Sequence, residues 1–248
     1  MRDRAALVAL YRSTNGSAWR DATRWLSDEA PCSSDGVANW GSCSSSQCED
    51  VAASDGLSYL DGSIACAGIC CGSNGTVDAI LLYDNGLDGS LPTELGLATA
   101  LRYLDTGYTS LQGSFPTELG LATALRYLDT GYTGLDGSLP TELGLATSLR
   151  ILVTSSTSVS GFLPTELGLA TGLRDLVTSS TTLSGVLPTQ IGLTTALQYL
   201  STGSTFMSGS LPTQLGNARA IQSLITYGTY ISGSLPTQLC SLMALQAL

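Results

Sequence analysis

Two aspartates in adjacent copies of a repeated segment are the most obvious candidates for chemistry. Asp105 and Asp129 lie 24 residues apart, each within Leu-Arg-Tyr-Leu-Asp-Thr-Gly-Tyr. If each copy adds one strand to a parallel sheet, the carboxylates lie about 5 Å apart, as the acid pair of a retaining glycosidase does. That mechanism needs one acid with a raised pKa, whereas the neighbouring Arg102 and Arg126 are expected to keep both ionised. We therefore interpret the pair as non-catalytic.

The composition excludes most other catalytic systems. The chain has 248 residues, ten basic residues that are all arginine, and no histidine. Histidine-dependent nucleophiles, histidine-ligated metals and lysine Schiff bases are therefore impossible. The net charge of −10 also argues against nucleic acid as a partner, because binding it requires basic residues. We expect no enzyme activity and no cofactor.

Two further acidic patterns are better explained by structure than by chemistry. The segment Asp84 to Gly89 looks like the start of a calcium loop, but Leu95 stands where a bidentate glutamate is required. We therefore expect no metal site. A column of acids turns into glutamines later in the chain, which is typical of a solvated face: Glu94, Glu118, Glu142, Glu166, Gln190, Gln214 and Gln238.

The cysteines indicate an oxidising compartment. Six of the seven lie in one polar stretch: Cys32, Cys43, Cys48, Cys66, Cys70 and Cys71. They predict up to three disulfides, with a zinc site as the weaker alternative because paired C-x-x-C motifs are absent. Cys240 has no local partner and is predicted to be a free, buried thiol. Two N-x-[ST] sequons make Asn15 and Asn74 predicted glycosylation sites and agree with an extracellular or secretory-pathway location.

From residue 77 onward the sequence repeats every 24 residues. Prolines keep this spacing without interruption, at Pro92, Pro116, Pro140, Pro164, Pro188, Pro212 and Pro236. Glycines and leucines recur in the same register, so turns and core positions are locked together. A period of this length predicts a solenoid, in which no repeat can bury its leucines alone.

Each unit follows L-x-x-L-x-(L/T)-x-x-(N/T)-x-L-x-G-x-L-P-T-(E/Q)-L-G, as in residues 101–116. This pattern resembles the plant-type leucine-rich repeat over residues 77–248, with an incomplete last repeat. The resemblance implies a solenoid with a parallel β-sheet on its concave face and 3₁₀ or irregular turns on its convex side. Polygalacturonase-inhibiting proteins and receptor-kinase ectodomains are similar in architecture.

Residues 1–76 resemble the N-terminal cap of that family, with a cysteine-rich insertion. Residues 4–11 have helical apolar spacing, and the segment ending at Trp19 predicts a turn and an aromatic plug. The family's usual cysteine pair with a nearby tryptophan is matched by Cys32, Trp40 and Cys71. About thirty additional residues lie between them, so the pairing stays open among fifteen connectivities.

Threonines replace the family's usual residues in two columns. Thr106, Thr130, Thr154, Thr178, Thr202 and Thr226 stand at a leucine position, and Thr109, Thr133, Thr157, Thr181, Thr205 and Thr229 at the asparagine position. We interpret both columns as inward-facing ladders whose hydroxyls are satisfied internally. The alternative is an ice-binding face, since regular threonines on a solenoid resemble those of antifreeze solenoids.

The strand positions that alternate with core positions predict a partner-binding face. Its residues are Tyr103, Asp105, Tyr108, Tyr127, Asp129, Tyr132, Val153, Val177, Ser201, Ile225 and Tyr227. The face is aromatic and acidic near the cap and uncharged further on, and residues 176–248 carry a single charge, Arg219. Tyrosines of this kind are common anchors at interfaces.

The sequence therefore predicts a non-catalytic module that binds a protein, or a glycan, through its exposed sheet. The alternatives are ice binding and a structural role in a larger assembly. No segment is apolar enough to span a membrane. The last residues enter an eighth strand without a polar cap, so further chain or a partner is expected to cover that end.

Overall fold

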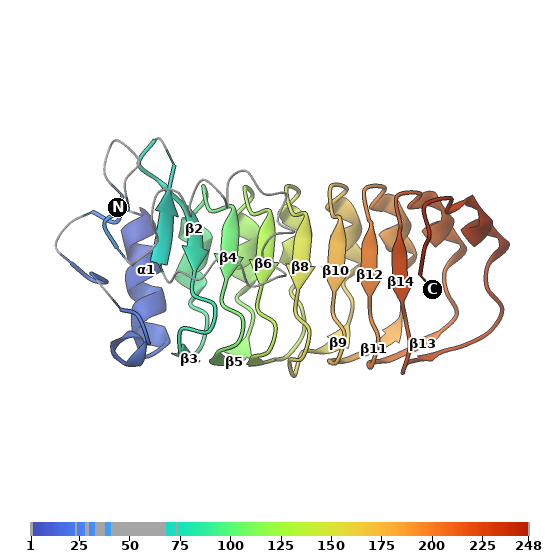
Figure 1. Ribbon diagram of the computed structural model, residues 1–248, viewed down its shortest axis with the longest axis horizontal. Helices are drawn as coiled ribbons and strands as arrows, with labels where there is room; N and C mark the ends of the chain where they lie inside the picture. Colours follow the sequence, from blue (N-terminus) through green and yellow to red (C-terminus); the bar gives the residue numbers. More distant parts are fainter. Residues whose placement is uncertain are drawn as a thin grey trace.

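The computed structural model describes residues 2–22, 24–27, 30–32, 38–40, 68–72 and 74–247. The repeats stack along the long axis of the molecule, with the N-terminal helix at one end and the C-terminus at the other (Figure 1). The predicted disulfide residues Cys43, Cys48 and Cys66 lie outside the described residues.

The N-terminal segment caps the first repeat. Helix α1 (Arg2–Ser13) buries Ala6, Leu7 and Leu10, and the short 3₁₀ helix η1 (Gly16–Ala18) follows it. Backbone carbonyls at the end of α1 accept hydrogen bonds from the first repeat, from the Asp88 amide to Thr14 and from the Ser90 amide to Ser13. After η1, Trp19 and Trp25 pack edge to face with ring centroids 4.8 Å apart. The predicted helix, turn and aromatic plug are therefore present.

The cysteines beside the cap form disulfides. Cys32 is bonded to Cys71, the pair that the family resemblance singles out, and Cys70 is also disulfide-bonded. These three sulfur atoms are thus unavailable as zinc ligands. Cys240 is a free thiol as predicted, but it is exposed rather than buried. In the preceding turns the equivalent glycine is covered by the next turn, and no described residue covers Cys240 in this way.

One eight-stranded sheet runs the length of the solenoid. Its strands, in spatial order, are β1 (Gly68–Cys71), β2 (Val77–Leu81), β4 (Tyr103–Asp105), β6 (Tyr127–Asp129), β8 (Ile151–Val153), β10 (Asp175–Val177), β12 (Tyr199–Ser201) and β14 (Ser223–Ile225). Each repeat contributes one strand, and equivalent residues pair in register, so Asp105 lies opposite Asp129. The exception to the parallel arrangement is β1, which pairs antiparallel with β2 and extends the sheet toward the cap.

Two smaller parallel sheets form a second side of the solenoid. The first contains β3 (Asp88–Gly89), β5 (Ser110–Ser114) and β7 (Gly134–Asp136). The second, here called the C-terminal side sheet, contains β9 (Ser160–Phe162), β11 (Thr182–Val186), β13 (Phe206–Gly209) and β15 (Tyr230–Ile231). Alternation along these strands points residues such as Leu183 into the core and their neighbours outward.

Short 3₁₀ helices return the chain on the remaining side. They are η3 (Thr93–Leu97), η4 (Thr117–Leu121), η5 (Thr141–Leu145), η6 (Thr165–Leu169), η7 (Thr189–Leu193), η8 (Thr213–Asn217) and η9 (Thr237–Ser241). Each begins after the repeated proline, whose fixed φ suits the entry to the turn.

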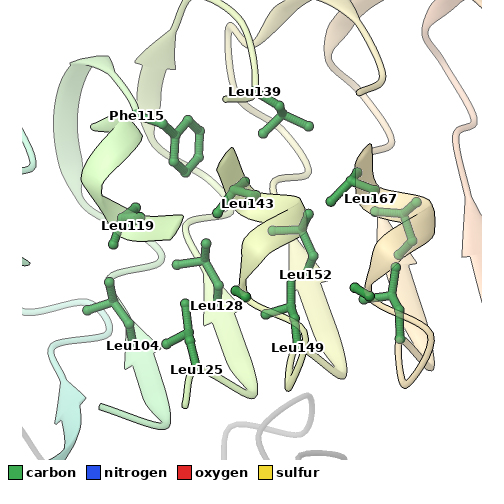
Figure 2. Packing of buried hydrophobic residues seen from close by; sticks show 14 of the residues in the cluster. Leu104, Phe115, Leu119, Leu125, Leu128, Leu139, Leu143, Leu149, Leu152 and Leu167 are labelled. Carbon is green, nitrogen blue, oxygen red and sulfur yellow. The ribbon is translucent and has the colours of Figure 1, made fainter. Parts of the chain in front are cut away.

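Leucines from all sides meet in one continuous core. Leu104, Leu128 and Leu152 point inward from the main sheet, and Leu119, Leu143 and Leu167 meet them from the 3₁₀ helices (Figure 2). All six are fully buried. Burying one such side chain is worth roughly 1.5 to 3 kcal/mol, and every repeat supplies several, so stacking holds the solenoid together.

Both threonine columns lie inside the solenoid. Thr130, Thr154 and Thr178 are fully buried, and in the second column Thr133, Thr157 and Thr181 are at most 8% exposed. Second-column hydroxyls donate to the carbonyl three residues earlier, as Thr157 does to Thr154 at 2.8 Å. The prediction that both columns face inward is confirmed. The prediction that all their hydroxyls are satisfied is wrong for the first column, because the buried hydroxyls of Thr154 and Thr202 have no hydrogen-bond partner among the described residues. The hypothesis of ice binding through these columns is wrong, because residues buried in the core present no surface to ice.

Candidate binding surface

The outer face of the main sheet carries a second apolar cluster near the cap. Cys70, Ala79, Leu81, Tyr103, Tyr127, Ile151 and Val153 pack together there, with Val177 at its border. The Tyr103 and Tyr127 rings lie 6.4 Å apart. The prediction that Tyr103, Asp105, Tyr127, Val153 and Ser201 are exposed is wrong, since each is at most 6% exposed. For Tyr103, Tyr127 and Val153 the reason is that they pack into this cluster on the outer face of the sheet.

The aspartate pair lies beside this cluster and is held by local hydrogen bonds. Asp105 accepts from the Gly107 amide at 3.1 Å, and Asp129 accepts from the Gly131 amide at 2.7 Å. The Tyr127 hydroxyl donates to the second carboxylate oxygen of Asp129 at 3.2 Å. Burial, followed by repulsion from Asp129, raises the pKa of Asp105 to about 8. Burial also raises the pKa of Asp129.

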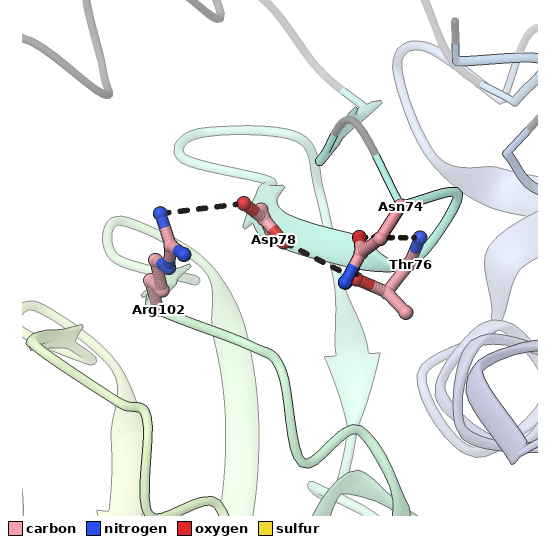
Figure 3. A network of polar contacts seen from close by, with 4 residues as sticks. All are labelled: Asn74, Thr76, Asp78 and Arg102. Atoms are coloured by element: carbon pink, nitrogen blue, oxygen red, sulfur yellow. Dashed lines mark hydrogen bonds and ion pairs between the residues drawn. The ribbon is translucent and has the colours of Figure 1, made fainter. Parts of the chain in front are cut away.

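These pKa values correct the argument made from the sequence. Arg102 and Arg126 are not among the groups that shift the pKa of either acid. Burial raises the pKa of both, and repulsion from Asp129 raises that of Asp105 further. Arg102 instead pairs with Asp78 at 3.6 Å (Figure 3). The pKa of Asp78 is nevertheless raised, first by burial, with Arg102 acting against that rise.

The predicted glycosylation sites are both at the surface. Asn74 lies in the turn between β1 and β2, where its side-chain oxygen accepts a hydrogen bond from the Thr76 hydroxyl at 2.6 Å (Figure 3). Asn15 is exposed at the turn after α1. Both side chains are therefore reachable, and glycosylation stays a prediction.

A row of three exposed tyrosines borders the main sheet, and we call it the tyrosine ladder: Tyr83, Tyr108 and Tyr132. The centroids of Tyr83 and Tyr108 lie 5.0 Å apart, and those of Tyr108 and Tyr132 lie 4.2 Å apart with the rings nearly parallel. The three side chains are 42%, 47% and 52% exposed. Stacked aromatic rings that face solvent form a rigid platform with an apolar surface and polar tips.

The backbone under the ladder adopts a conformation that tyrosine disfavours. Tyr108 and Tyr132 both have φ of 55°, in the left-handed region. The same position is held by Ser156, Ser180 and Ser204 in later repeats and by Gly228 in the last one. A bulky residue at positive φ is an outlier, and such strain collects at binding sites. The ring stacking therefore offsets the conformational cost of positive φ, which is larger for tyrosine than for serine or glycine.

Acidic groups surround the first ring of the ladder. The pKa of Tyr83 is raised, first by burial and then by the negative charges of Asp105, Asp84 and Asp129. Asp84 forms an ion pair with Arg20 of the cap. The first ring of the platform thus adjoins three acidic side chains, of which Asp84 is paired with Arg20 and the other two have raised pKa values.

The remaining predicted binding residues do not join this platform. Val177 and Ile225 are half-buried on the sheet further along, and Tyr227 is 69% exposed at the end of the last complete repeat. Sequence reasoning missed Tyr83, because it stands one position earlier in its repeat than Tyr108 does in the next. The contact could have been found by comparing neighbouring positions of adjacent repeats, because the tyrosine at the seventh position of one repeat contacts the tyrosine at the eighth position of the next.

No group of three or more potential metal ligands occurs among the described residues. Within the same residues no helix is long and apolar enough to cross a membrane.

The fold of this chain is that of plant-type leucine-rich-repeat proteins. Solved structures with the same architecture are ectodomains of plant receptors. The plant peptide hormone receptor RGFR1, in complex with RGF2, is 28% identical with a TM-score of 0.68, over 69% of this chain and 28% of that chain. The ectodomain of GASSHO1/SCHENGEN3 from Arabidopsis thaliana, in complex with CASPARIAN STRIP INTEGRITY FACTOR 2, is 25% identical with a TM-score of 0.65, over 74% and 25%.

A third structure covers nearly the whole chain. PEPR1–AtPEP1 is 24% identical with a TM-score of 0.76, over 99% of this chain and 31% of that chain, which shows the shared fold. The chain spans less than a third of the length of each of these three proteins. No protein-family model and no curated protein matches the sequence, so the similarity rests on structure.

Proposed function

We propose that the chain is a non-catalytic, extracellular binding module that recognises a peptide or protein segment through the tyrosine ladder. The observation that carries the proposal is the stacking of three half-exposed rings in successive repeats, two of them on left-handed backbone. Rigid tyrosines lose little conformational entropy on binding and bury large areas, which makes them frequent hot spots.

The similar receptor ectodomains support the class of partner. The structure of RGFR1 is a complex with RGF2, and that of GASSHO1/SCHENGEN3 is a complex with an integrity factor. The exposed ring faces of the ladder favour a ligand segment that carries an aromatic or a basic side chain, because a cation or a second ring stacks on the face of a tyrosine. Disulfides at the cap support an extracellular or secretory-pathway location.

A display library of random peptides, selected on the folded protein, tests this proposal. Peptides that bind the parent chain are expected to lose at least roughly tenfold in affinity for the double variant Tyr108→Ser/Tyr132→Ser, a loss of about 1.4 kcal/mol or more. Serine occupies this position in three later repeats, so the variant keeps the backbone that the fold uses.

A matched control separates a binding effect from a folding effect. Tyr230→Ser removes an exposed tyrosine from the other end of the molecule and is expected to leave peptide affinity unchanged. Selected peptides that bind the ladder variant and the parent equally would contradict the proposal. If the protein instead binds oligosaccharides, and the ladder variant does not, the ladder is the binding surface but the ligand is a glycan and not a peptide.

A further inference from the structure

A second exposed apolar surface lies on the C-terminal side sheet, far along the chain from the tyrosine ladder. We call it the side-sheet patch: Phe162, Val186, Phe206 and Tyr230. These side chains are 71%, 59%, 53% and 66% exposed. Four large apolar side chains left in solvent on one small sheet are unusual for a monomer, and such patches mark interaction sites.

The four side chains form one contiguous patch. Ser184 pairs with Phe162 on one side and with Phe206 on the other, and Ser208 pairs with Val186 and Tyr230. Only serines therefore separate the apolar residues. The rings of Phe206 and Tyr230 stack with centroids 6.2 Å apart and planes 14° apart. Phe162 and Val186 cover Gly185 and Gly209 of the following strands, so the patch has no gap over the backbone.

The equivalent surface in the first half of the molecule is polar. On β3, β5 and β7 the outward positions carry Asp88, Gln112 and Asp136 together with serines. The outward residues of the side sheets thus change from acidic and polar to apolar along the solenoid. The change coincides with the loss of charge from the sequence, since residues 176–248 contain no acid and one base, Arg219.

We propose that the side-sheet patch is the contact surface between two copies of this chain. The protein carries a net charge of −10, so two copies repel each other over most of their surface. Val186, Phe206 and Tyr230 of the patch lie in the nearly uncharged segment 176–248, so this surface lets two copies approach without placing carboxylates against carboxylates. A two-fold pairing brings the same patch of both copies together, so rings meet rings and serines fill the spaces between them.

The other exposed apolar column is less suitable for self-association. It consists of Leu97, Leu121, Leu145, Leu169 and Leu193, one from each of η3 to η7. The first four share their short helix with a glutamate, so pairing two such columns would bring acidic residues together. The charge pattern therefore selects the side-sheet patch.

The molar mass in solution tests the proposal, measured by analytical ultracentrifugation over roughly a hundredfold range of concentration. The parent chain is expected to pass from monomer to dimer within that range. Dimerisation should strengthen with added salt, because salt screens the repulsion between two acidic copies. A monomer at all concentrations and salt levels would overturn the proposal.

Two variants locate the contact. The double variant Phe162→Ser/Phe206→Ser introduces the residue found at the equivalent positions of earlier repeats, Ser138 and Ser158. The single variant Ser184→Asp introduces a charge at the centre of the patch, as the equivalent Asp136 does in an earlier repeat. Both are expected to remain monomeric with an unchanged far-ultraviolet circular dichroism spectrum. Tyr108→Ser/Tyr132→Ser should still dimerise. Dimers that persist in both patch variants would contradict the assignment.

Discussion

At the scale of single residues, the two threonine columns fulfil different roles although both are buried. Thr157 donates to the Thr154 carbonyl at 2.8 Å, and its oxygen accepts from the Val159 amide at 3.4 Å. Thr154, by contrast, has a buried hydroxyl with no hydrogen-bond partner among the described residues. The second column thus replaces an asparagine ladder with a hydroxyl ladder, whereas the first column mainly fills space.

This difference predicts opposite outcomes for two isosteric substitutions. Thr157→Val should lower the free energy of unfolding by about 1 to 2 kcal/mol, because it leaves backbone groups without their side-chain partner. Thr154→Val should be neutral or stabilising, because it removes a hydroxyl that is buried and unsatisfied. Urea denaturation of the two variants checks this, and equal destabilisation would show that both columns contribute hydrogen bonds.

The buried aspartate pair predicts that stability falls as the pH rises. The pKa of Asp105 is about 8 in the folded protein, against 3.8 for an ordinary aspartate, so the folded state holds the proton more tightly. The resulting stabilisation is complete below the unfolded pKa and is lost as the pH rises through about 8. Asp175, with a pKa raised by burial to about 6, acts in the same direction.

Asp105→Asn is expected to be more stable than the parent at pH 8, by on the order of a few kcal/mol, and to flatten the dependence on pH. Asparagine keeps an oxygen that can accept from the Gly107 amide. The exposed Asp136→Asn removes the same charge and serves as the control, with little effect expected. Thermal unfolding between pH 5 and pH 9 measures both. A parent protein that gains stability toward pH 8 would show that the acids are ionised in the fold.

At the scale of the elements, the glycine in each of the 3₁₀ helices η3 to η8 lets successive turns stack closely. A Cβ added to Gly144 would collide with the carbonyl oxygen of Glu166 in the next turn. Gly144→Ala is therefore expected to cost about 1 to 3 kcal/mol through overpacking. Gly172→Ala is the matched control, since its Cβ would find only an atom 4.0 Å away and alanine stands at that position in other repeats. Differential scanning calorimetry should show a lower melting temperature for Gly144→Ala alone.

The sequence predicts the elements well because the 24-residue spacing constrains every inward position. Prolines, leucines and threonines recur with it, so the turn, the core and the ladder follow from the pattern. The pattern says less about the outer face, where Tyr103 and Val153 occupy outward positions of a sheet that is buried on both sides. Nor does the pattern predict the left-handed backbone of Tyr108, because that conformation is expected for glycine and not for tyrosine. The antiparallel strand β1 lies before the first repeat, so the 24-residue pattern does not predict it.

At the scale of the whole molecule, the solenoid has two unlike ends. The end near the cap carries the tyrosine ladder and most of the acids, and the far end carries the side-sheet patch and almost no charge. A rigid stack of repeats keeps the two surfaces apart, so one can bind a ligand while the other pairs two copies. A dimer of this kind would present two ladders and could bind a bivalent partner with increased avidity.

The most direct test of the proposed function is amide hydrogen exchange of the parent protein with and without a peptide selected on it. Binding at the ladder predicts slower exchange in segments 105–109 and 129–133, where the amides of Tyr108 and Tyr132 bond to the next repeat. Exchange in η4 and η5, on a different side of the same repeats, should not change. Protection confined to the 3₁₀ helices or to the cap, with the ladder segments unaffected, would contradict the proposed function.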